Sequence, residues 1–108
     1  MLLAALALAA QPLPPHIAII GRGNGSCEQW SAHLQAGRET PERIADVAWL
    51  EGYLSGINVA SHWGNAASTR DIAEVTALVD SRCAERPQDQ VVLVVGAVIM
   101  ARRRRVET

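Results

Sequence analysis

The sequence predicts one small all-α domain, a bundle of about four helices with one disulfide bond. Three observations support this class. Residues that cap helix N-termini recur, and each is followed by apolar residues at helical spacing. Aromatic residues make up only 4% of the chain, so the core must consist of closely packed aliphatic side chains. The two cysteines, Cys27 and Cys83, can supply the covalent cross-link that small domains often need.

The chain begins with an uninterrupted apolar run from Met1 to Ala10. The run is too short to cross a bilayer as a helix, but it fits the apolar region of a secretory signal. Residues Ala7-Leu8-Ala9 match a cleavage site, although no Lys or Arg precedes the run. We therefore expect a signal segment over 1–10, lacking its basic start. The alternative is an apolar N-terminal helix packed on the core.

Residues 11–25 are expected to form an extended linker that ends in a glycine-rich turn, and the helical domain then covers 26–102. Ser26 caps the first helix, with Gln29 as the reciprocal partner of a capping box, and Gly37 ends it. The apolar face of this helix consists of Cys27, Trp30 and Leu34.

The second helix is predicted from Pro41 to Trp63 and is closed by Gly64. Thr40 is its N-cap, Pro41 occupies the first helical position, and Glu42 lies near the positive end of the helix dipole. Its apolar stripe consists of Val47, Leu50, Leu54 and Ile57.

A third helix begins near Ser68 or Thr69 and is stopped by Pro87. Its apolar face consists of Ile72, Val75, Val79 and Cys83.

A last helix, capped by Asp89, is expected over 91–101, followed by a basic tail at 103–108. The valine-rich run of this segment also fits a buried strand, and periodicity alone does not separate the two.

The charges are unevenly distributed along the chain. Four of the ten arginines lie at 102–105, so the preceding part has six arginines against ten acidic residues, and the chain has no lysine. Because a nucleic-acid-binding protein presents a basic face, this balance argues against that class. The apolar run at 91–101 is also too short for a membrane anchor, so we expect no stable membrane insertion.

In an exported chain, two cysteines are most simply one disulfide, here Cys27–Cys83. Closing a loop of this length should stabilise the fold by about 4 kcal/mol in the chain-entropy description. The alternative is a catalytic or redox-active thiol, but the chain has no C-x-x-C motif.

The glycine cluster Gly21-Arg22-Gly23-Asn24-Gly25 superficially resembles a dinucleotide-binding loop, with Asp46 at about the right distance. Asp46 falls inside a predicted helix, however, so a turn leading into the first helix is the better interpretation.

No other pattern indicates catalysis or a cofactor. The three histidines (His16, His33 and His62) lack metal-ligand spacing, and no serine lies in a nucleophile-elbow motif. We therefore predict no catalytic residue, no metal and no cofactor, and the expected class is not an enzyme.

Small residues recur every fourth position of the second predicted helix, at Ala48, Gly52, Gly56 and Ala60. Glycine inside a helix costs about 1 kcal/mol relative to alanine, so two of them imply a packing reason. We expect this ridge to contact another helix of the domain closely, with close approach of a ligand as the alternative.

A polar stripe follows the same helix at Glu51, Ser55, Asn58 and His62, with Trp63 beside it. A solvated face explains the stripe without further assumptions. The functional alternative is that these five residues contact a partner.

Three motifs together suggest a family: GNGSCEQW at the start of the first helix, WLEGYLSGIN in the second, and Cys83 followed by Pro87. Over roughly Gly21 to Ala101 the chain resembles small, mostly uncharacterised exported bacterial proteins similar to the Rap/Tai family of amidase immunity proteins, and more distantly HdeA-like acid-stress chaperones. The resemblance implies an all-helical periplasmic domain with one disulfide and no enzymatic role, and it favours a helix at 91–101.

Two functions follow as hypotheses. The first is a periplasmic or secreted non-enzymatic binding protein, an immunity-type inhibitor of an exported toxin, whose partner is another protein. The second is an HdeA-like chaperone activated when its acidic residues lose charge at low pH. A homodimer and a structural role in an envelope assembly are further alternatives.

Overall fold

The computed structural model describes residues 13–61 and 65–107, with side chains up to Arg104. Within these ranges the chain is helical and contains no strand: α2 (Cys27–Ala36), α3 (Pro41–Ala60), α4 (Ile72–Glu85) and α5 (Val91–Glu107) follow a short 3-10 turn, η1 (Arg22–Asn24). The predicted all-α class is therefore confirmed. The expected signal segment at 1–10 lies outside the described residues.

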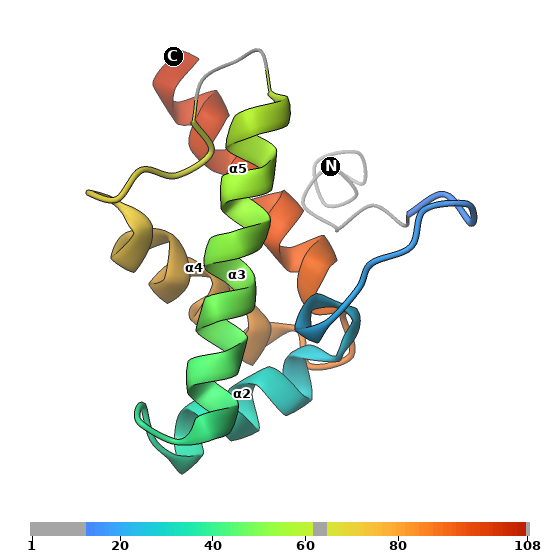
Figure 1. The fold of residues 1–108 in the computed structure, drawn as a ribbon, viewed down its shortest axis with the longest axis vertical. Coiled ribbons are helices and arrows are strands. Elements are labelled where there is room, and N and C mark those ends of the chain that lie inside the picture. The colour runs from blue at the N-terminus through green and yellow to red at the C-terminus, as the bar shows by residue number, and fades with distance from the viewer. Residues whose placement is uncertain (1–12, 62–64, 108) are drawn as a thin grey trace, which may run out of the picture.

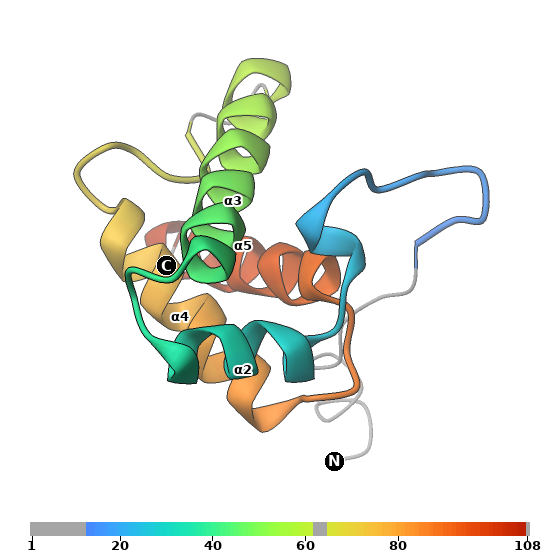
Figure 2. The same ribbon diagram turned by 60° about the horizontal axis from the view of Figure 1, so that its bottom comes forward.

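The longest helix, α3, extends through most of the height of the molecule, and α2 crosses its lower end (Figure 1). Helix α4 packs against both α2 and α5, while η1 contacts α3 and α5. In both ribbon views the segment before η1 extends away from the helical body (Figures 1 and 2). A pocket opens where η1, α2 and α3 meet, and it is the candidate site.

The core is aliphatic, as the scarcity of aromatic residues predicts. The predicted apolar stripes of α3, apart from Val47, and of α4 supply its centre, and α5 adds a valine-rich face. The residues that are most completely buried are Leu50, Leu54, Val75, Val79, Val91, Val94, Val95 and the two cysteines.

The disulfide joins the first residue of α2, Cys27, to Cys83 near the end of α4, with the two Cα atoms 4.7 Å apart. Both cysteines are fully buried. Beside the bond, the first amides of α2 donate hydrogen bonds to the loop that follows α4: Cys27 N–H to the Asp89 carbonyl and Glu28 N–H to the Pro87 carbonyl. The predicted pairing is therefore confirmed, and hydrogen bonds at the same junction satisfy helix donors that would otherwise lack partners.

The N-cap residues predicted for the first two helices are confirmed. The Ser26 hydroxyl accepts a hydrogen bond from Gln29 N–H at 3.2 Å, and Thr40 Oγ1 accepts one from Arg43 N–H at 3.3 Å. Helix α3 ends at Ala60, however, and not at Trp63, because the backbone of Ser61 turns to an extended conformation.

The start of α4 was predicted too early. The helix begins at Ile72 because Asp71 folds back on a tight turn: its carboxylate accepts hydrogen bonds from both the backbone N–H and the hydroxyl of Ser68.

The prediction that Asp89 caps the last helix was wrong, because its carboxylate binds Arg86 Nε at 2.5 Å. The Gln90 carbonyl accepts the first helical bonds of α5, from Leu93 and Val94. The helix then continues to Glu107, through residues that were expected to form a separate basic tail at 103–108. Residues 103–107 are therefore part of α5.

The ridge of small residues on α3 does not pack inside the domain, which contradicts the expected helix–helix contact. Ala48, Gly52, Gly56 and Ala60 are all exposed, and a Cβ placed on Gly52 or Gly56 would meet no atom of residues 13–61 and 65–107 within 4 Å. The opposite face of α3 contains the larger Leu50 and Leu54, and burying larger apolar side chains contributes more to stability. The core therefore selects that face, and the ridge faces solvent.

The glycine cluster forms the expected turn, and one of its glycines is required for packing. Gly23 is buried beneath the indole of Trp49, where an added Cβ would lie 2.0 Å from two ring atoms. Trp49 also donates from Nε1 to the Ile20 carbonyl at 3.1 Å and stacks on Tyr53 with ring centroids 5.0 Å apart. The turn is thereby anchored to α3, which places Arg22 next to that helix.

Candidate functional site

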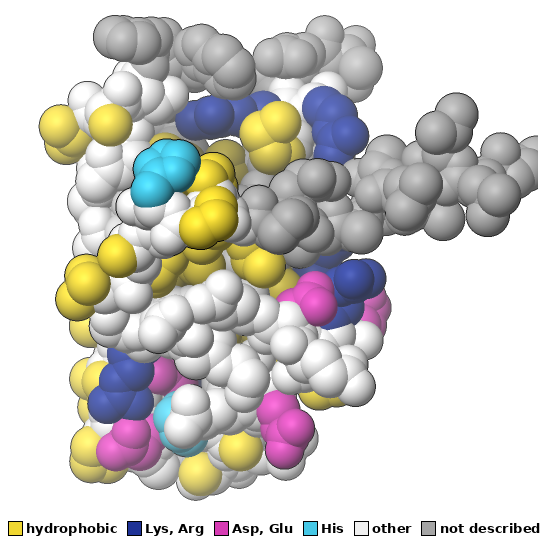
Figure 3. All heavy atoms as spheres, turned by 90° about the vertical axis from the view of Figure 1, so that its right-hand side faces the viewer, with side chains coloured by type: hydrophobic (Ala, Val, Ile, Leu, Met, Phe, Trp, Pro, Cys, Tyr) yellow, Lys and Arg dark blue, Asp and Glu magenta, His cyan; other side chains and the backbone are white. Residues whose placement is uncertain are grey.

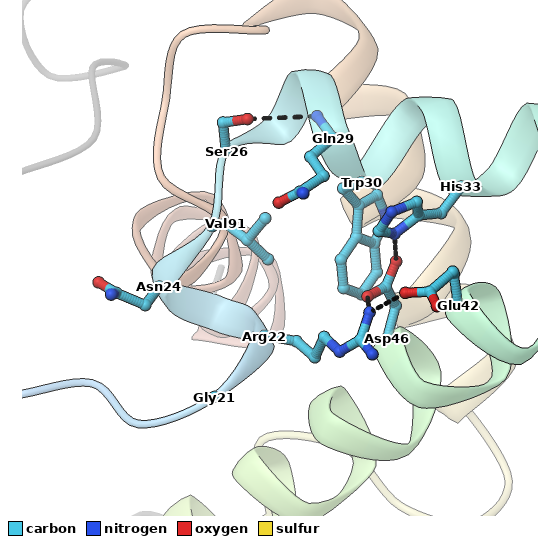
Figure 4. A pocket seen from close by; sticks show the side chains of 11 residues that line it. Gly21, Arg22, Asn24, Ser26, Gln29, Trp30, His33, Glu42, Asp46 and Val91 are labelled. Carbon is cyan, nitrogen blue, oxygen red and sulfur yellow. Dashed lines mark hydrogen bonds and ion pairs between the residues drawn. The ribbon is translucent and has the colours of Figure 1, made fainter.

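A polar pocket of about 510 Å³ opens where η1, α2 and α3 meet (Figure 4). Its volume is within the range of small-ligand sites, about 300–1,000 Å³. On the face shown in Figure 3, acidic, arginine and histidine side chains gather in the lower part of the molecule. The pocket is lined by Gly21, Arg22, Asn24, Gly25, Ser26, Gln29, Trp30, His33, Glu42, Asp46 and Val91.

Local helix geometry positions the charged side chains of this pocket. Trp30 and His33 are three residues apart on α2, and Glu42 and Asp46 are four residues apart on α3, so each pair lies on one face of its helix. Arg22 reaches the same space from η1.

Asp46 is the centre of this group, with a side chain only 3% exposed. One carboxylate oxygen, Oδ2, lies 2.7 Å from His33 Nδ1. The other, Oδ1, lies 3.5 Å from Arg22 Nη1, which makes its short contact, 2.7 Å, with Glu42 Oε2. Figure 4 shows these four side chains converging from three elements.

The ion pair at the pocket mouth affects both of its members. The hydrogen bond from Arg22, and then its charge, hold the pKa of Glu42 below the usual value, and the same hydrogen bond raises the pKa of Arg22. Both groups are therefore ionised at neutral pH.

A second polar network lies next to the pocket wall. Arg43 is buried on α3 and donates to both oxygens of Asp80 on α4, at 2.9 and 2.8 Å. Trp30 Nε1 donates to the same Asp80 at 2.8 Å, and the Arg43 guanidinium lies 5.5 Å from the centre of the Trp30 ring. This network joins α2, α3 and α4 and fixes the tryptophan that forms the pocket wall.

The chemistry available here favours binding over nucleophilic catalysis. A histidine held by a buried carboxylate has the arrangement of a general base. A nucleophile is also needed, and among the described lining residues the one with a hydroxyl group is Ser26. Its oxygen already accepts a hydrogen bond from Gln29 N–H as the N-cap of α2. The pocket instead offers carboxylate acceptors beside a fixed aromatic wall.

Three residues of the predicted polar stripe, Glu51, Ser55 and Asn58, lie within the described part of the chain. Glu51 and Ser55 are exposed, whereas His62 and Trp63 lie outside the described residues. Asn58 is half-buried and fastens the loop after α3: its side-chain amide donates to the Ala67 carbonyl at 2.8 Å and accepts from Ala66 N–H at 2.6 Å.

Glu51, Ser55 and Asn58 also border a second pocket of about 340 Å³ between α3 and this loop. The partner-binding role of the stripe stays a prediction.

Sequence reasoning missed the residues of the polar pocket: Arg22, His33, Glu42 and Asp46. His33 and Asp46 are thirteen positions apart on different helices, so no local motif indicates that they pair. The i, i+4 spacing of Glu42 and Asp46 was the available signal, but such pairs also occur on ordinary solvated faces.

No protein-family model, no curated protein and no solved structure matches this chain. Within residues 13–61 and 65–107, no helix is both long enough and apolar enough to cross a membrane.

Proposed function

We propose that this chain is a small exported protein that binds and inhibits a protein partner, in the manner of an immunity protein, and has no catalytic activity of its own. The observation that carries the proposal is the outer face of α3, defined here as Ile44, Ala48, Gly52, Ser55 and Val59. These five positions lie within one arc of the helix.

This outer face is unusual for a solvent-facing surface. Ile44 is 56% exposed and Val59 is 89% exposed. Between them the helix presents one exposed charged side chain, Glu51. Surface helices normally carry charged and polar residues on the solvent side, whereas this face has an exposed apolar residue near each end and small residues between them.

The small residues on this face suit a helix as the contacting element. Without a side chain at Gly52, the backbone of a second helix can approach α3 closely, and none of the described residues occupies that space. The disulfide and the resemblance to Rap/Tai immunity proteins support export and a binding role.

An acid-activated chaperone is the second candidate, and one observation favours it. The carboxylates that fasten α5 to α4 and η1 to α3 include Asp71 and Glu42, whose pKa values are held low by hydrogen bonds from Ser68 and Arg22 respectively. Strong acid would protonate both groups and loosen these contacts.

One experiment separates the two candidates. The oxidised full chain is immobilised, exposed to an extract of exported proteins at neutral pH and in acid, and compared with Gly52→Leu, which fills the space on the outer face of α3. Ala84→Leu, at an exposed position of α4, is the matched control.

An inhibitor should capture one stoichiometric partner at neutral pH and suppress that partner's activity. Gly52→Leu should then weaken capture about tenfold or more, the loss expected for blocking a central contact, while Ala84→Leu should not. Many clients captured only in acid would favour the chaperone. Equal capture by Gly52→Leu and wild type would remove the outer face of α3 as the binding surface.

A further inference from the structure

The polar pocket contains a carboxylate, Asp46, with one oxygen that is held only by a long hydrogen bond from the residues that the structure describes. Asp46 Oδ2 has a short contact with His33, whereas Oδ1 accepts from Arg22 at 3.5 Å, the limit of a hydrogen bond. A carboxylate this deeply buried normally accepts several short, charge-assisted bonds. Asp46 borders the pocket, so a donor that enters it could supply the missing bond.

The charges that face the pocket are not balanced. Glu42 and Asp46 from α3 supply two carboxylates, and Arg22 from η1 supplies one guanidinium. His33, the titratable residue that α2 contributes, uses Nδ1 to contact Asp46, and α5 contributes the uncharged Val91. Leaving His33 aside, two carboxylates face one guanidinium, an excess of one negative charge that favours a cation.

The buried Arg43 beside the pocket wall is already paired. Its guanidinium directs both terminal nitrogens at Asp80 and lies against Trp30. Arg43 is therefore not available to neutralise Glu42 and Asp46.

Arg22 shows what kind of group fits. One nitrogen of its guanidinium, Nη1, contacts Glu42 Oε2 at 2.7 Å and approaches Asp46 Oδ1 at 3.5 Å, so both carboxylates lie within reach of guanidinium N–H donors. Arg22 is 38% exposed and comes from a three-residue turn, so it meets Asp46 from the edge of the pocket and does not fill it.

We infer that this pocket accepts the guanidinium of an arginine side chain on the protein partner, with Asp46 Oδ1 as its principal acceptor and Glu42 as the second. The source of the arginine rests on the proposed function, since that function supplies the protein partner. Arg22 then acts as a like-charged neighbour that weakens binding. The acidic balance of the chain before its arginine run agrees with a partner that presents basic side chains.

The test titrates the oxidised full chain with N-acetyl-arginine methylamide and follows backbone amide shifts by NMR. N-acetyl-citrulline methylamide is the matched probe, since it has nearly the same shape and no charge. We expect saturable shifts at His33 and Asp46 with the arginine probe, and affinity at least about fivefold weaker with the citrulline probe, as for loss of one charge-assisted contact. Equal binding of the two probes would overturn the inference.

Arg22→Gln is the most informative variant because it should improve binding, which a purely structural role would not produce. Removing the neighbouring positive charge should raise affinity for the arginine probe severalfold. Asp46→Asn should abolish binding, and Glu42→Gln, at an exposed position, should weaken it with little effect on the fold. No saturable binding by Arg22→Gln would contradict the inference.

The same probes keep this inference separate from the proposed function. Gly52→Leu should bind the arginine probe like wild type, because that position is remote from the pocket lining. Failure of the probe to bind would remove the pocket but leave the outer face of α3 intact as a docking surface. If methylguanidinium binds as tightly as the arginine probe, the pocket recognises a free small cation, and the inference of an arginine from a protein partner is overturned.

Discussion

Arg43 and Asp80 form a two-bonded ion pair that joins α3 to α4, with Nη1 2.9 Å from Oδ1 and Nη2 2.8 Å from Oδ2. The arginine side chain is only 7% exposed, and Trp30 completes the network from α2. Three helices that share few other polar contacts therefore depend on one carboxylate. Removing that carboxylate should affect stability more than removing any exposed charge.

We expect Asp80→Ala to lower the free energy of unfolding by about 3 kcal/mol, because the buried Arg43 would lose its partner. Urea denaturation of the oxidised chain measures this loss. Glu85→Ala, at an exposed position of the same helix, should change stability by less than about 0.5 kcal/mol. A similar small effect for both variants would show that water replaces the ion pair without cost.

Gly23→Ala and Gly56→Ala should have opposite effects. A methyl group on Gly23 would lie 2.0 Å from the Trp49 ring, so we expect a loss of about 1–3 kcal/mol from overpacking. On Gly56 the methyl group meets nothing within 4 Å, and the better helix propensity of alanine should add up to about 1 kcal/mol. Thermal unfolding of both variants tests the pair, and destabilisation by Gly56→Ala would contradict the exposed position of the ridge.

Asp71 should make stability depend on pH in the acid range. Hydrogen bonds from Ser68, and secondarily the charge of Arg102, hold the pKa of Asp71 below the usual value in the folded chain. A lowered folded pKa means that the contribution is complete above the unfolded pKa, about 3.9, and is lost as the pH falls through the folded pKa.

Unfolding free energies measured from pH 7 downward should therefore favour wild type over Asp71→Asn at neutral pH. The difference should shrink below about pH 5, where the unfolded chain begins to bind the proton. A difference that stays constant across this range would mean that the ionisation of Asp71 is not linked to folding.

Asn58→Ala should loosen the loop after α3, because both groups of the side-chain amide bond to that loop. We expect a loss of about 1–3 kcal/mol from the unsatisfied loop amide and carbonyl. Hydrogen exchange at Ala66 N–H reports the local change. Ser55→Ala is the control, since its hydroxyl bonds only to the Glu51 carbonyl one turn away, and unchanged exchange in Asn58→Ala would argue against the structural role.

Local signals predicted the helix ends that depend on neighbouring residues. Ser26 and Thr40 cap α2 and α3 because each hydroxyl needs an amide only three positions away. The start of α4 was predicted too early because Ser68 does not cap the helix: its backbone N–H and hydroxyl donate to the Asp71 carboxylate. The residue types alone do not decide between these two roles of Ser68.

The candidate site could not be predicted in the same way. The sequence by itself determined the first three long helices and most of the apolar stripes of α3 and α4, because these follow from periodicity and short-range bonding. The cysteine pairing followed from the presence of two cysteines, although they lie 56 positions apart. Only the tertiary structure decided that His33 meets Asp46 and that the small-residue ridge of α3 faces solvent. Both outcomes depend on how α2 crosses α3 and on which face of α3 the core selects, and that selection reflects the summed burial of many distant side chains.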